Sequence, residues 1–303
     1  MALVFDVVTV GHVLADIRFM VDEFIGPDEE GVILEQSRGV GGSAANVAIG
    51  VRRLGLSSAI IAKVGFDSFG RIAVDELMKE GVDISGLKVS FSSTGFTIVI
   101  IDNKGQICLY GYKGASEELE PCDINVDIIE KTKYVHIASL RLDTSIEAAR
   151  KAKEHGKMVS WDPGRVQSKA GLQKLKDLIK HVDIVLANEE EARNITSESD
   201  YKKAAEVIGE LGPRLVVVKR GARGAYVLSE KECLEVPPLK PPKIVDTTGA
   251  GDAFAAGLLV GLARGYELSK ALTYASATAA LKIAKLGSHE TPTHDEVIKF
   301  IWG

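Results

Sequence analysis

Short apolar runs alternate with helix-like stretches from residue 133 onward, and this alternation limits the possible folds more than any other feature of the sequence. We predict strands at 134–138, 158–161, 184–187 and 215–218, and helices at 144–155, 170–181, 189–195 and 200–211. Strands that alternate with helices in this way pair in parallel, with helices on both faces of the sheet. The sequence therefore predicts an α/β fold, in which apolar runs at 4–10 and 58–64 add strands to the same sheet.

Four further segments have one polar face. Residues 17–24 and 32–36 alternate apolar and polar side chains, and 96–101 and 106–110 flank the turn sequence at 102–105. This alternation is typical of antiparallel strands with one wet face, and the turn predicts a hairpin. We expect a small antiparallel sheet, from about 17–36 and 91–113, set apart from the core of a single domain over 1–303.

A glycine-rich segment, Asp246-Thr-Thr-Gly-Ala-Gly-Asp252, precedes an almost wholly apolar, helix-like run at 253–260. Glycines let backbone N–H groups approach a ligand closely, and the unpaired amides at a helix start attract phosphate. Asp252 is placed to accept a proton from a hydroxyl beside that phosphate. The alternative is an ordinary N-cap, because Asp often begins helices. The second carboxylate and the apolar helix favour a phosphate-binding site.

Polar residues and turns also follow the predicted strands. Asp16 lies six residues after 4–10, and the later strands are followed by Ser139 to Arg141, Asp162, Asn188 to Glu191, and Lys219 to Gly224. Ligands bind beyond the carboxyl ends of parallel strands, so we expect these residues along one edge. Glu191 suits a contact to Mg²⁺ through water. Its alternative role is only to complement the helix N-terminus.

A second glycine-rich segment, Arg38-Gly-Val-Gly-Gly-Ser-Ala-Ala-Asn46, leads into an amphipathic stretch at 47–54. Part of it matches the G-x-G-x-x-A dinucleotide fingerprint. That fingerprint requires a core strand before it and an acid about twenty residues after it, and neither is found. We therefore reject a dehydrogenase, which would bind NAD tightly. Tight glycines followed by Asn46 fit recognition of hydroxyl groups better.

The charge and the cysteines exclude several other classes of protein. A net charge of -5 argues against binding to nucleic acid or to anionic membranes. The longest apolar run, 253–263, is too short to span a bilayer, and the first residues lack the basic start of a secretion signal. Three scattered cysteines without a CxxC pair fit a reducing cytoplasm and no cysteine-based metal site.

Together these segments resemble the ribokinase (PfkB) family of carbohydrate kinases over essentially the whole chain. The C-terminal signature of that family is matched almost letter for letter by 246–257, and the N-terminal signature by 41–55; segments 65–70 and 188–191 fit further motifs. The resemblance implies a doubly wound α/β sandwich with a protruding β lid that often forms a dimer interface. It also implies transfer of the γ-phosphoryl group of ATP to a substrate hydroxyl, with Mg²⁺ as cofactor.

The resemblance also implies roles for individual residues. Asp252 would be the catalytic base, and the transferring phosphoryl group would be held by Gly249, Ala250 and Gly251. The substrate hydroxyls would be bound by Asp16, Gly41, Gly42 and Asn46. The nucleotide would lie near Asn188, Lys219, Gly221, Gly224, Gly249 and Gly251, with Glu191 near Mg²⁺. Asp246 and Thr248 match positions that, in some members, join a monovalent-cation site, which makes K⁺ a further expected ion.

Departures from the family pattern leave the substrate open. Leu14 stands where the family usually has Asn, and Arg38 and Arg141 stand where sugar-specific members need no cation. Because arginine binds phosphate well, both arginines suit a phosphorylated sugar. A sugar, a sugar acid, a nucleoside and a phosphosugar all remain candidate substrates. A binding protein that senses sugar or nucleotide without catalysis is the alternative from a different class.

Overall fold

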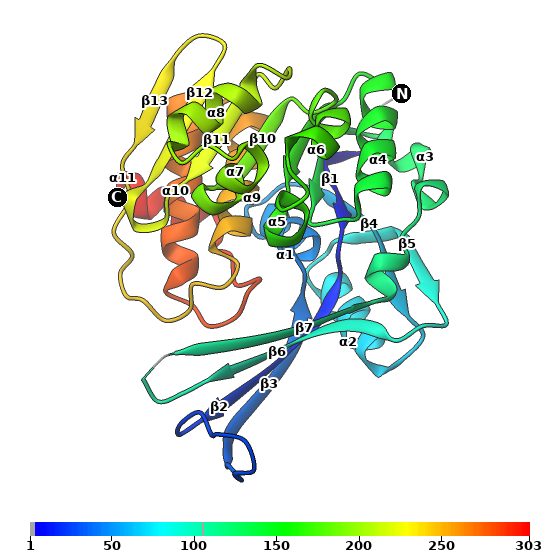
Figure 1. The fold of residues 1–303 in the computed structure, drawn as a ribbon, viewed down its shortest axis with the longest axis vertical. Helices are drawn as coiled ribbons and strands as arrows, with labels where there is room; N and C mark the ends of the chain where they lie inside the picture. Colours follow the sequence, from blue (N-terminus) through cyan, green and yellow to red (C-terminus); the bar gives the residue numbers. More distant parts are fainter. Residues whose placement is uncertain (1–3, 105) are drawn as a thin grey trace.

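The computed structural model describes residues 4–104 and 106–303, which form two β-sheets and the helices around them (Figure 1). The larger sheet has nine strands in the order β13-β12-β11-β10-β9-β8-β1-β4-β5. The strands are β1 (Phe5–Gly11), β4 (Ser58–Gly65), β5 (Asp83–Ser90), β8 (Thr132–Ala138), β9 (Met158–Asp162), β10 (Ile184–Asn188), β11 (Leu215–Lys219), β12 (Ala225–Ser229) and β13 (Cys233–Val236). All pairings from β5 to β11 are parallel, which confirms the predicted sheet.

Three strands of this sheet lie outside the prediction. Strand β5 adds to one edge in parallel, and β12 and β13 add to the other edge in antiparallel fashion. Most residues of β5 and β13 are half-buried or exposed. Edge strands of this kind lack the continuous apolar run that predicts a central strand, so the sequence pattern did not reveal them.

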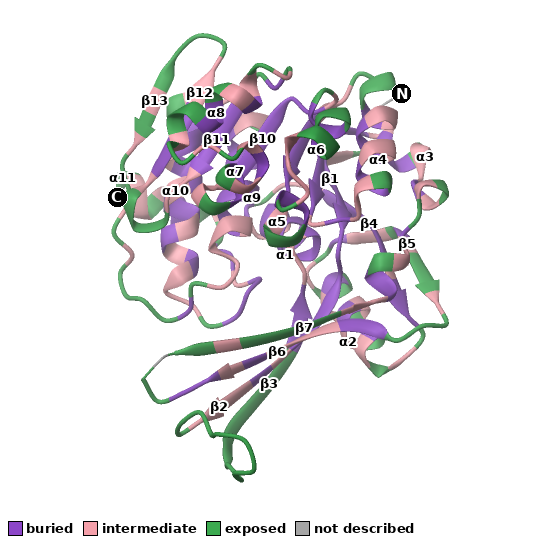
Figure 2. Cartoon of the chain, viewed as in Figure 1, coloured by how far each residue is buried: buried purple, intermediate pink, exposed green. Residues whose placement is uncertain are grey.

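Helices cover both faces of the larger sheet, as predicted (Figures 1 and 2). One face packs against side chains from α3, α4, α6, α7 and α8, and the other against α1, α2, α9, α10 and α11. Their bounds are α1 (Ser43–Arg53), α2 (Ser68–Lys79), α3 (Val126–Ile129), α4 (Leu142–Glu154), α5 (Gly164–Ser168), α6 (Leu172–Ile179), α7 (Glu189–Thr196), α8 (Tyr201–Gly209), α9 (Ala250–Ala263), α10 (Leu268–Ile283) and α11 (His294–Trp302). Three short 3₁₀ turns, η1 (Ala115–Glu118), η2 (Pro121–Asp123) and η3 (Gly221–Arg223), complete the elements of the described residues.

The smaller sheet projects from the body of the molecule, and we call it the lid (Figure 1). Its order is β3-β2-β6-β7, with β2 (Leu14–Val21), β3 (Ile33–Gly41), β6 (Thr94–Ile101) and β7 (Ile107–Gly114). The pairs β2–β3 and β6–β7 are antiparallel as predicted, but β2 and β6 run parallel, so a wholly antiparallel sheet is wrong for this pairing. Strands β2 and β6 therefore both run away from the body in the same direction. The predicted turn at 102–105 includes Gly105, which lies outside the described residues.

The carboxyl ends of the parallel strands meet at one edge of the larger sheet. Gly11 pairs with Ala138, Ala138 with Asp162, and Asn188 with Lys219. The polar residues that follow these strands are therefore neighbours, as the sequence predicts. Within the described ranges, none of the helices combines the length and the apolar character needed to cross a membrane.

Candidate active site

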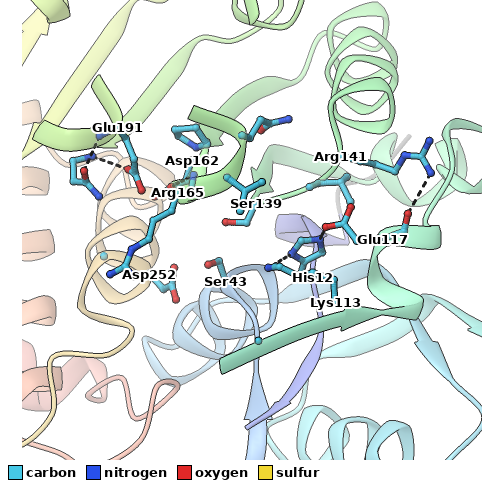
Figure 3. Close-up of a pocket in the computed structure, with 18 of the residues that line it drawn as sticks. His12, Ser43, Lys113, Glu117, Ser139, Arg141, Asp162, Arg165, Glu191 and Asp252 are labelled. Carbon is cyan, nitrogen blue, oxygen red and sulfur yellow. Dashed lines mark hydrogen bonds and ion pairs between the residues drawn. The ribbon is translucent and has the colours of Figure 1, made fainter. Parts of the chain in front are cut away.

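A cavity of about 750 Å³ lies between this edge of the larger sheet and the lid (Figure 3). Thr97, Leu109 and Gly111 line the cavity from the lid, and Gly251 and Asp252 line it from the first turn of α9. The cavity therefore brings the glycine-rich segment 246–252 against the small sheet.

Helix α9 begins with open backbone amides. Its N-cap is Gly249, with a left-handed φ of 77°, and no side chain of the described residues caps the helix. A Cβ on Gly249 would lie 2.0 Å from the carbonyl oxygen of Ser288, so only glycine fits there. The Ala250 amide donates to Thr247 O at 3.2 Å, which leaves the amides of Gly251 and Asp252 for a ligand. Because Gly249 is the N-cap, Asp252 does not cap the helix.

Asp252 is held by the other glycine-rich segment. The side-chain amide of Asn46, on α1, donates to Oδ2 of Asp252 at 2.7 Å, although the two residues are 206 positions apart. Burial raises the pKa of Asp252 to about 6, and the nearby carboxylate of Asp162 adds to this, while the Asn46 bond opposes it. A carboxylate with a pKa near 6 is well suited to accept a proton near neutral pH.

Lys219 places a cation beside the open amides. Its Nζ lies 2.6 Å from Oδ2 of Asp162, and a Cβ added at Gly251 would lie 3.3 Å from the same Nζ. Burial lowers the pKa of Lys219, but the carboxylates of Asp162 and Glu191 more than offset this effect and raise it overall. The ammonium therefore stays charged next to the first turn of α9.

Asn188 and Glu191 form a capping box on α7. The Asn188 amide donates to Oε2 of Glu191 at 2.8 Å, and the Glu191 amide donates to Oδ1 of Asn188 at 2.9 Å. Glu191 therefore does cap the helix N-terminus, yet both residues also line the cavity. Burial raises the pKa of Glu191, and the charge of Asp162 raises it further. In the described part of the chain, no group of three or more His, Cys, Asp and Glu residues is arranged to hold a metal.

A polar chain that the sequence analysis missed lies on the lid side of the cavity (Figure 3). Nζ of Lys113 is 3.2 Å from Nδ1 of His12, and Nε2 of His12 is 3.1 Å from Oε1 of Glu117. Lys113 shares the cavity-lining face of β7 with Leu109 and Gly111, because side chains two residues apart on a strand point the same way. The predicted strand ended at residue 110; extension of its alternation by three residues would have placed Lys113 in the site.

The two candidate arginines occupy different places. Arg141 lines the cavity, but its guanidinium donates to both oxygens of Asp143, at 2.7 and 2.6 Å. Arg38 pairs with Ile17 across the lid, one residue out of step with Asp16 and Thr97. Since Thr97 faces the cavity, Arg38 lies on the opposite face of the lid. Lys113 is thus a better placed lid cation than Arg38.

Asp16, Gly41 and Gly42 pack together rather than line the cavity. The Asp16 carboxylate is buried and accepts from Arg18 at 2.9 Å and from Ser288 at 2.7 Å. A Cβ on Gly41 would lie 2.0 Å from Oδ1 of Asp16, and one on Gly42 would lie 2.4 Å from a backbone oxygen of the β1–β2 connection. These close contacts explain why both positions are glycine. Asn46 contributes to the site through its hydrogen bond to Asp252.

Gly221 begins η3 and Gly224 follows it; neither of these two glycines, expected near the nucleotide, lines the cavity. Gly224 has a φ of 83°, and a Cβ there would lie 2.0 Å from the carbonyl oxygen of Val236. An added Cβ at Gly221 would meet no described atom within 4 Å. Packing therefore explains Gly224, whereas Gly221 leaves open surface next to Lys219 that a nucleotide can approach.

The expected monovalent-cation position contains a side chain of the protein itself. Nζ of Lys282 donates to the backbone oxygen of Asp246 at 2.9 Å and lies 3.8 Å from Oδ2 of the same residue. The Asp246 carboxylate also accepts from the amides of Thr248 and Gly287, at 2.8 and 3.0 Å. A metal ion bound to the Asp246 oxygen would lie against an ammonium, so these residues do not fit K⁺.

These groups can stabilise and receive an anionic phosphoryl group. The open amides of Gly251 and Asp252 and the Lys219 ammonium lie together at the start of α9, and the Asp252 carboxylate lines the same cavity. Donors that are fixed before the reaction stabilise developing negative charge strongly in a site with little water. A carboxylate at the same place can take the proton of an attacking hydroxyl.

Comparisons with known proteins agree with this chemistry. The family model described as pfkB family carbohydrate kinase matches residues 4–295. An ATP-dependent ribose-1-phosphate kinase of Halopiger xanaduensis is 34% identical over 297 residues, which cover 97% of each chain. A nucleoside kinase of Methanocaldococcus jannaschii is 29% identical and covers 96% of this chain and 94% of its own. The crystal structure of a ribokinase from Thermotoga maritima superposes with a TM-score of 0.89 at 27% identity, over 99% of this chain and 100% of that chain.

Proposed function

This chain belongs to the pfkB family of carbohydrate kinases, and on that premise we propose that it transfers the γ-phosphoryl group of ATP to a hydroxyl of a phosphorylated sugar. The family accounts for the phosphotransferase class. The observation that carries the proposal for this site is one cavity in which Asp252, bonded to Asn46, lies beside the open amides of α9, with Lys113 on the opposite wall.

Asp252 acts as the general base in this proposal. It takes the proton of the acceptor hydroxyl as the oxygen attacks the γ-phosphorus, and the bond to the bridging oxygen of ADP breaks in line. The amides of Gly251 and Asp252 and the Lys219 ammonium stabilise the charge on the equatorial phosphoryl oxygens. Asn46 keeps the carboxylate oriented through its 2.7 Å hydrogen bond.

Mg²⁺ bound with ATP would neutralise phosphate charge, as in other phosphoryl-transfer enzymes. The residues fit a weakly held ion, because Glu191 has one carboxylate oxygen engaged in the capping box and lines the cavity with the rest of its side chain. Contact through water suits Mg²⁺, which keeps several waters and binds mainly to substrate phosphates.

The lining of the cavity favours a phosphorylated sugar over a free sugar. Besides Lys219, which serves the transferring group, the cavity is lined by the cations Lys113, Arg141 and Arg165. The relative named ribose-1-phosphate kinase has a substrate with such a phosphate, and we propose ribose 1-phosphate or a close pentose phosphate as the acceptor. Charge-assisted hydrogen bonds from Lys113 would hold its phosphate.

A nucleoside acceptor is the second candidate, because nucleoside kinases are among the relatives. Bases are usually bound by stacking on aromatic rings. The described residues that line the cavity include no Phe, Tyr or Trp, which favours the phosphosugar.

The test is a phosphate-transfer screen with ATP and Mg²⁺ over ribose 1-phosphate, ribose and nucleosides, using wild-type protein, Lys113→Met and Lys104→Met. We expect ribose 1-phosphate to have the highest kcat/KM. Loss of a charge-assisted contact should raise its KM about 10- to 100-fold in Lys113→Met, with KM for ATP unchanged. Lys104, exposed near the lid tip, is the matched control.

Higher kcat/KM for a nucleoside or for ribose would refute the phosphosugar. Binding of these ligands without any transfer would favour the sensor instead.

We propose further that two copies associate through the lid. On the lid face away from the cavity, Tyr110 and Tyr112 are 62% and 50% exposed, and Ile98 pairs with Tyr110 across β6 and β7. Exposed aromatic side chains on a sheet face are typical of interface residues. A cytoplasmic location is also proposed, on the basis of three free cysteines.

A further inference from the structure

The ammonium of Lys282 is buried behind the first turn of α9, the turn with the open amides. Lys282 is in the last turn of α10 and has a relative exposure of 0%. Its Nζ donates to the backbone oxygen of Asp246 at 2.9 Å and lies 3.8 Å from the Asp246 carboxylate. Lysine is almost never fully buried unless its charge is paired. The two Asp246 oxygens near Nζ are therefore the partners of this buried ammonium.

The Asp246 carboxylate joins the two loops that surround this ammonium. One oxygen accepts from the Thr248 amide at 2.8 Å and the other from the Gly287 amide at 3.0 Å. The Asp246 amide in turn donates to the carbonyl of Ile283 at 3.1 Å. The loop before α9 and the loop after α10 are thus fixed to each other around Lys282.

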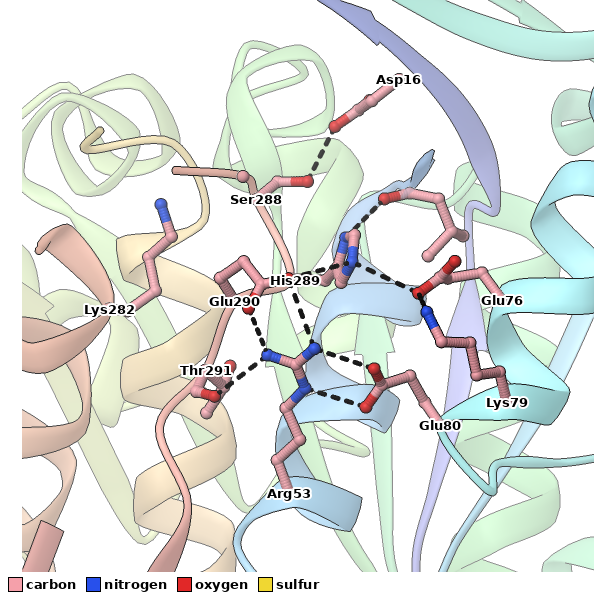
Figure 4. Close-up of polar contacts among 12 residues, drawn as sticks. Asp16, Arg53, Glu76, Lys79, Glu80, Lys282, Ser288, His289, Glu290 and Thr291 are labelled. Carbon is pink, nitrogen blue, oxygen red and sulfur yellow. Dashed lines mark hydrogen bonds and ion pairs between the residues drawn. The ribbon is translucent and has the colours of Figure 1, made fainter. Parts of the chain in front are cut away.

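The second loop contacts the anion-binding turn directly. The Ser288 carbonyl lies so close to Gly249 that an added Cβ would be 2.0 Å away. Figure 4 shows that the loop is also anchored outside this contact, because Ser288 donates to Asp16 and Glu290 pairs with Arg53 at 2.6 Å. A change at Lys282 would therefore be transmitted to Gly249 and to the open amides that follow it.

We propose that the Lys282 ammonium is a built-in monovalent cation that takes the place of the K⁺ expected at Asp246 and Thr248. Phosphoryl transfer by this chain therefore needs no added K⁺. A potassium ion in contact with the Asp246 backbone oxygen would overlap the space of Nζ and meet a like charge in a buried place. Lys282 is a positioning residue, since it acts through Asp246 and the loops.

The first test compares wild-type protein in K⁺, Na⁺ and tetramethylammonium chloride at one ionic strength. Both the initial rate with ATP, Mg²⁺ and acceptor and the melting temperature without substrate are measured. We expect the rate to change less than twofold among the salts and the melting temperature to be the same in each. The rate readout rests on the proposed function, whereas the melting temperature does not.

The second test uses Lys282→Ala, which removes the cation and leaves space, and Lys282→Met, which removes the charge but fills the space. In tetramethylammonium we expect kcat to fall at least tenfold in both, with a smaller change in the KM for ATP. K⁺ should restore kcat and raise the melting temperature of Lys282→Ala and should do neither for Lys282→Met. Lys285→Met, which removes a half-buried surface lysine paired with Glu296, is the matched control and should behave as wild type.

Several-fold activation of wild-type protein by K⁺, or a fully active Lys282→Ala variant in tetramethylammonium, would overturn the proposal. If both variants fail to fold, the wild-type comparison alone decides. If no acceptor is phosphorylated at all, the proposed function fails. The proposal for Lys282 is then tested by the melting temperature alone: a higher melting temperature of wild-type protein in K⁺ would contradict it.

Discussion

At the scale of single residues, the clearest test concerns Asp252. Asparagine keeps the size of the side chain but cannot take the proton of an acceptor hydroxyl, so Asp252→Asn should lower kcat about 10²- to 10⁴-fold. Binding of ATP should be retained, because the open amides of α9 and Lys219 are unchanged. Steady-state kinetics and calorimetric titration with ATP measure the two effects. Near-normal turnover would refute the role of Asp252.

The pH dependence of the reaction follows from the same carboxylate. Burial raises the pKa of Asp252 to about 6, and only the ionised form accepts a proton. We expect kcat/KM to be constant above neutral pH and to fall tenfold per pH unit below about 6. An acid limb near pH 4, the ordinary range of an aspartate, would show that this group is not the base.

The sequence predicted one part of the site at this scale and missed another. Asp252, Asn188, Glu191 and Lys219 were singled out from the sequence because glycine-rich turns and strand ends mark such positions locally. All four line the cavity, and their individual roles stay predictions. Lys282 gave no local signal: it is a single lysine in a helix of small residues, and its contact with Asp246 is 36 positions away. Partners at such separations are set by packing and cannot be predicted from spacing.

At the scale of elements, Arg53 at the end of α1 joins three parts of the chain. It donates to both oxygens of Glu80, at 2.8 Å each, and pairs with Glu290 at 2.6 Å (Figure 4). Its removal takes the arginine partner from two partly buried carboxylates, so Arg53→Met should lower the free energy of unfolding by about 1–3 kcal/mol.

Urea denaturation measures the effect of Arg53→Met. The control is Arg71→Met, whose side chain is 84% exposed and pairs with Asp75 at 3.6 Å. That variant should change the stability by less than about 0.5 kcal/mol. Equal effects of the two substitutions would contradict a special role for Arg53.

The elements themselves were predictable where a pattern is local. Alternation of apolar runs and helices predicted β8 to β11 and their parallel order, and the turn signal predicted the β6–β7 hairpin. The parallel pairing of β2 with β6 was not predictable, because a hairpin signal says nothing about which other hairpin lies beside it. Strand β13 was missed since no residue in it is fully buried.

At the scale of the whole molecule, lid pairing makes a prediction about mass in solution. Sedimentation should show a dimer for wild-type protein and a monomer for Tyr110→Lys, because a charge placed in an apolar interface is not compensated. Tyr110 is 62% exposed in the single chain, so its replacement should not disturb folding. Phe91→Lys changes an exposed aromatic residue outside the lid strands and should stay dimeric. A monomeric wild-type protein at micromolar concentration rules out the lid interface.

The parallel pairing of β2 and β6 also has a consequence for the order in which the chain folds. Residues 15–20 meet residues 96–101 only after the intervening segment, with α1, α2, β4 and β5, has closed into a loop. Closure of a loop this long costs entropy that later contacts must offset, and contacts between distant residues form slowly. During synthesis on a ribosome, the body strands β1, β4 and β5 can pair before lid strands β6 and β7 have been made. The lid is then complete by residue 114, before strands β8 to β13 and helix α9 are made, so the nascent protein acquires the Asp252 side of its cavity last.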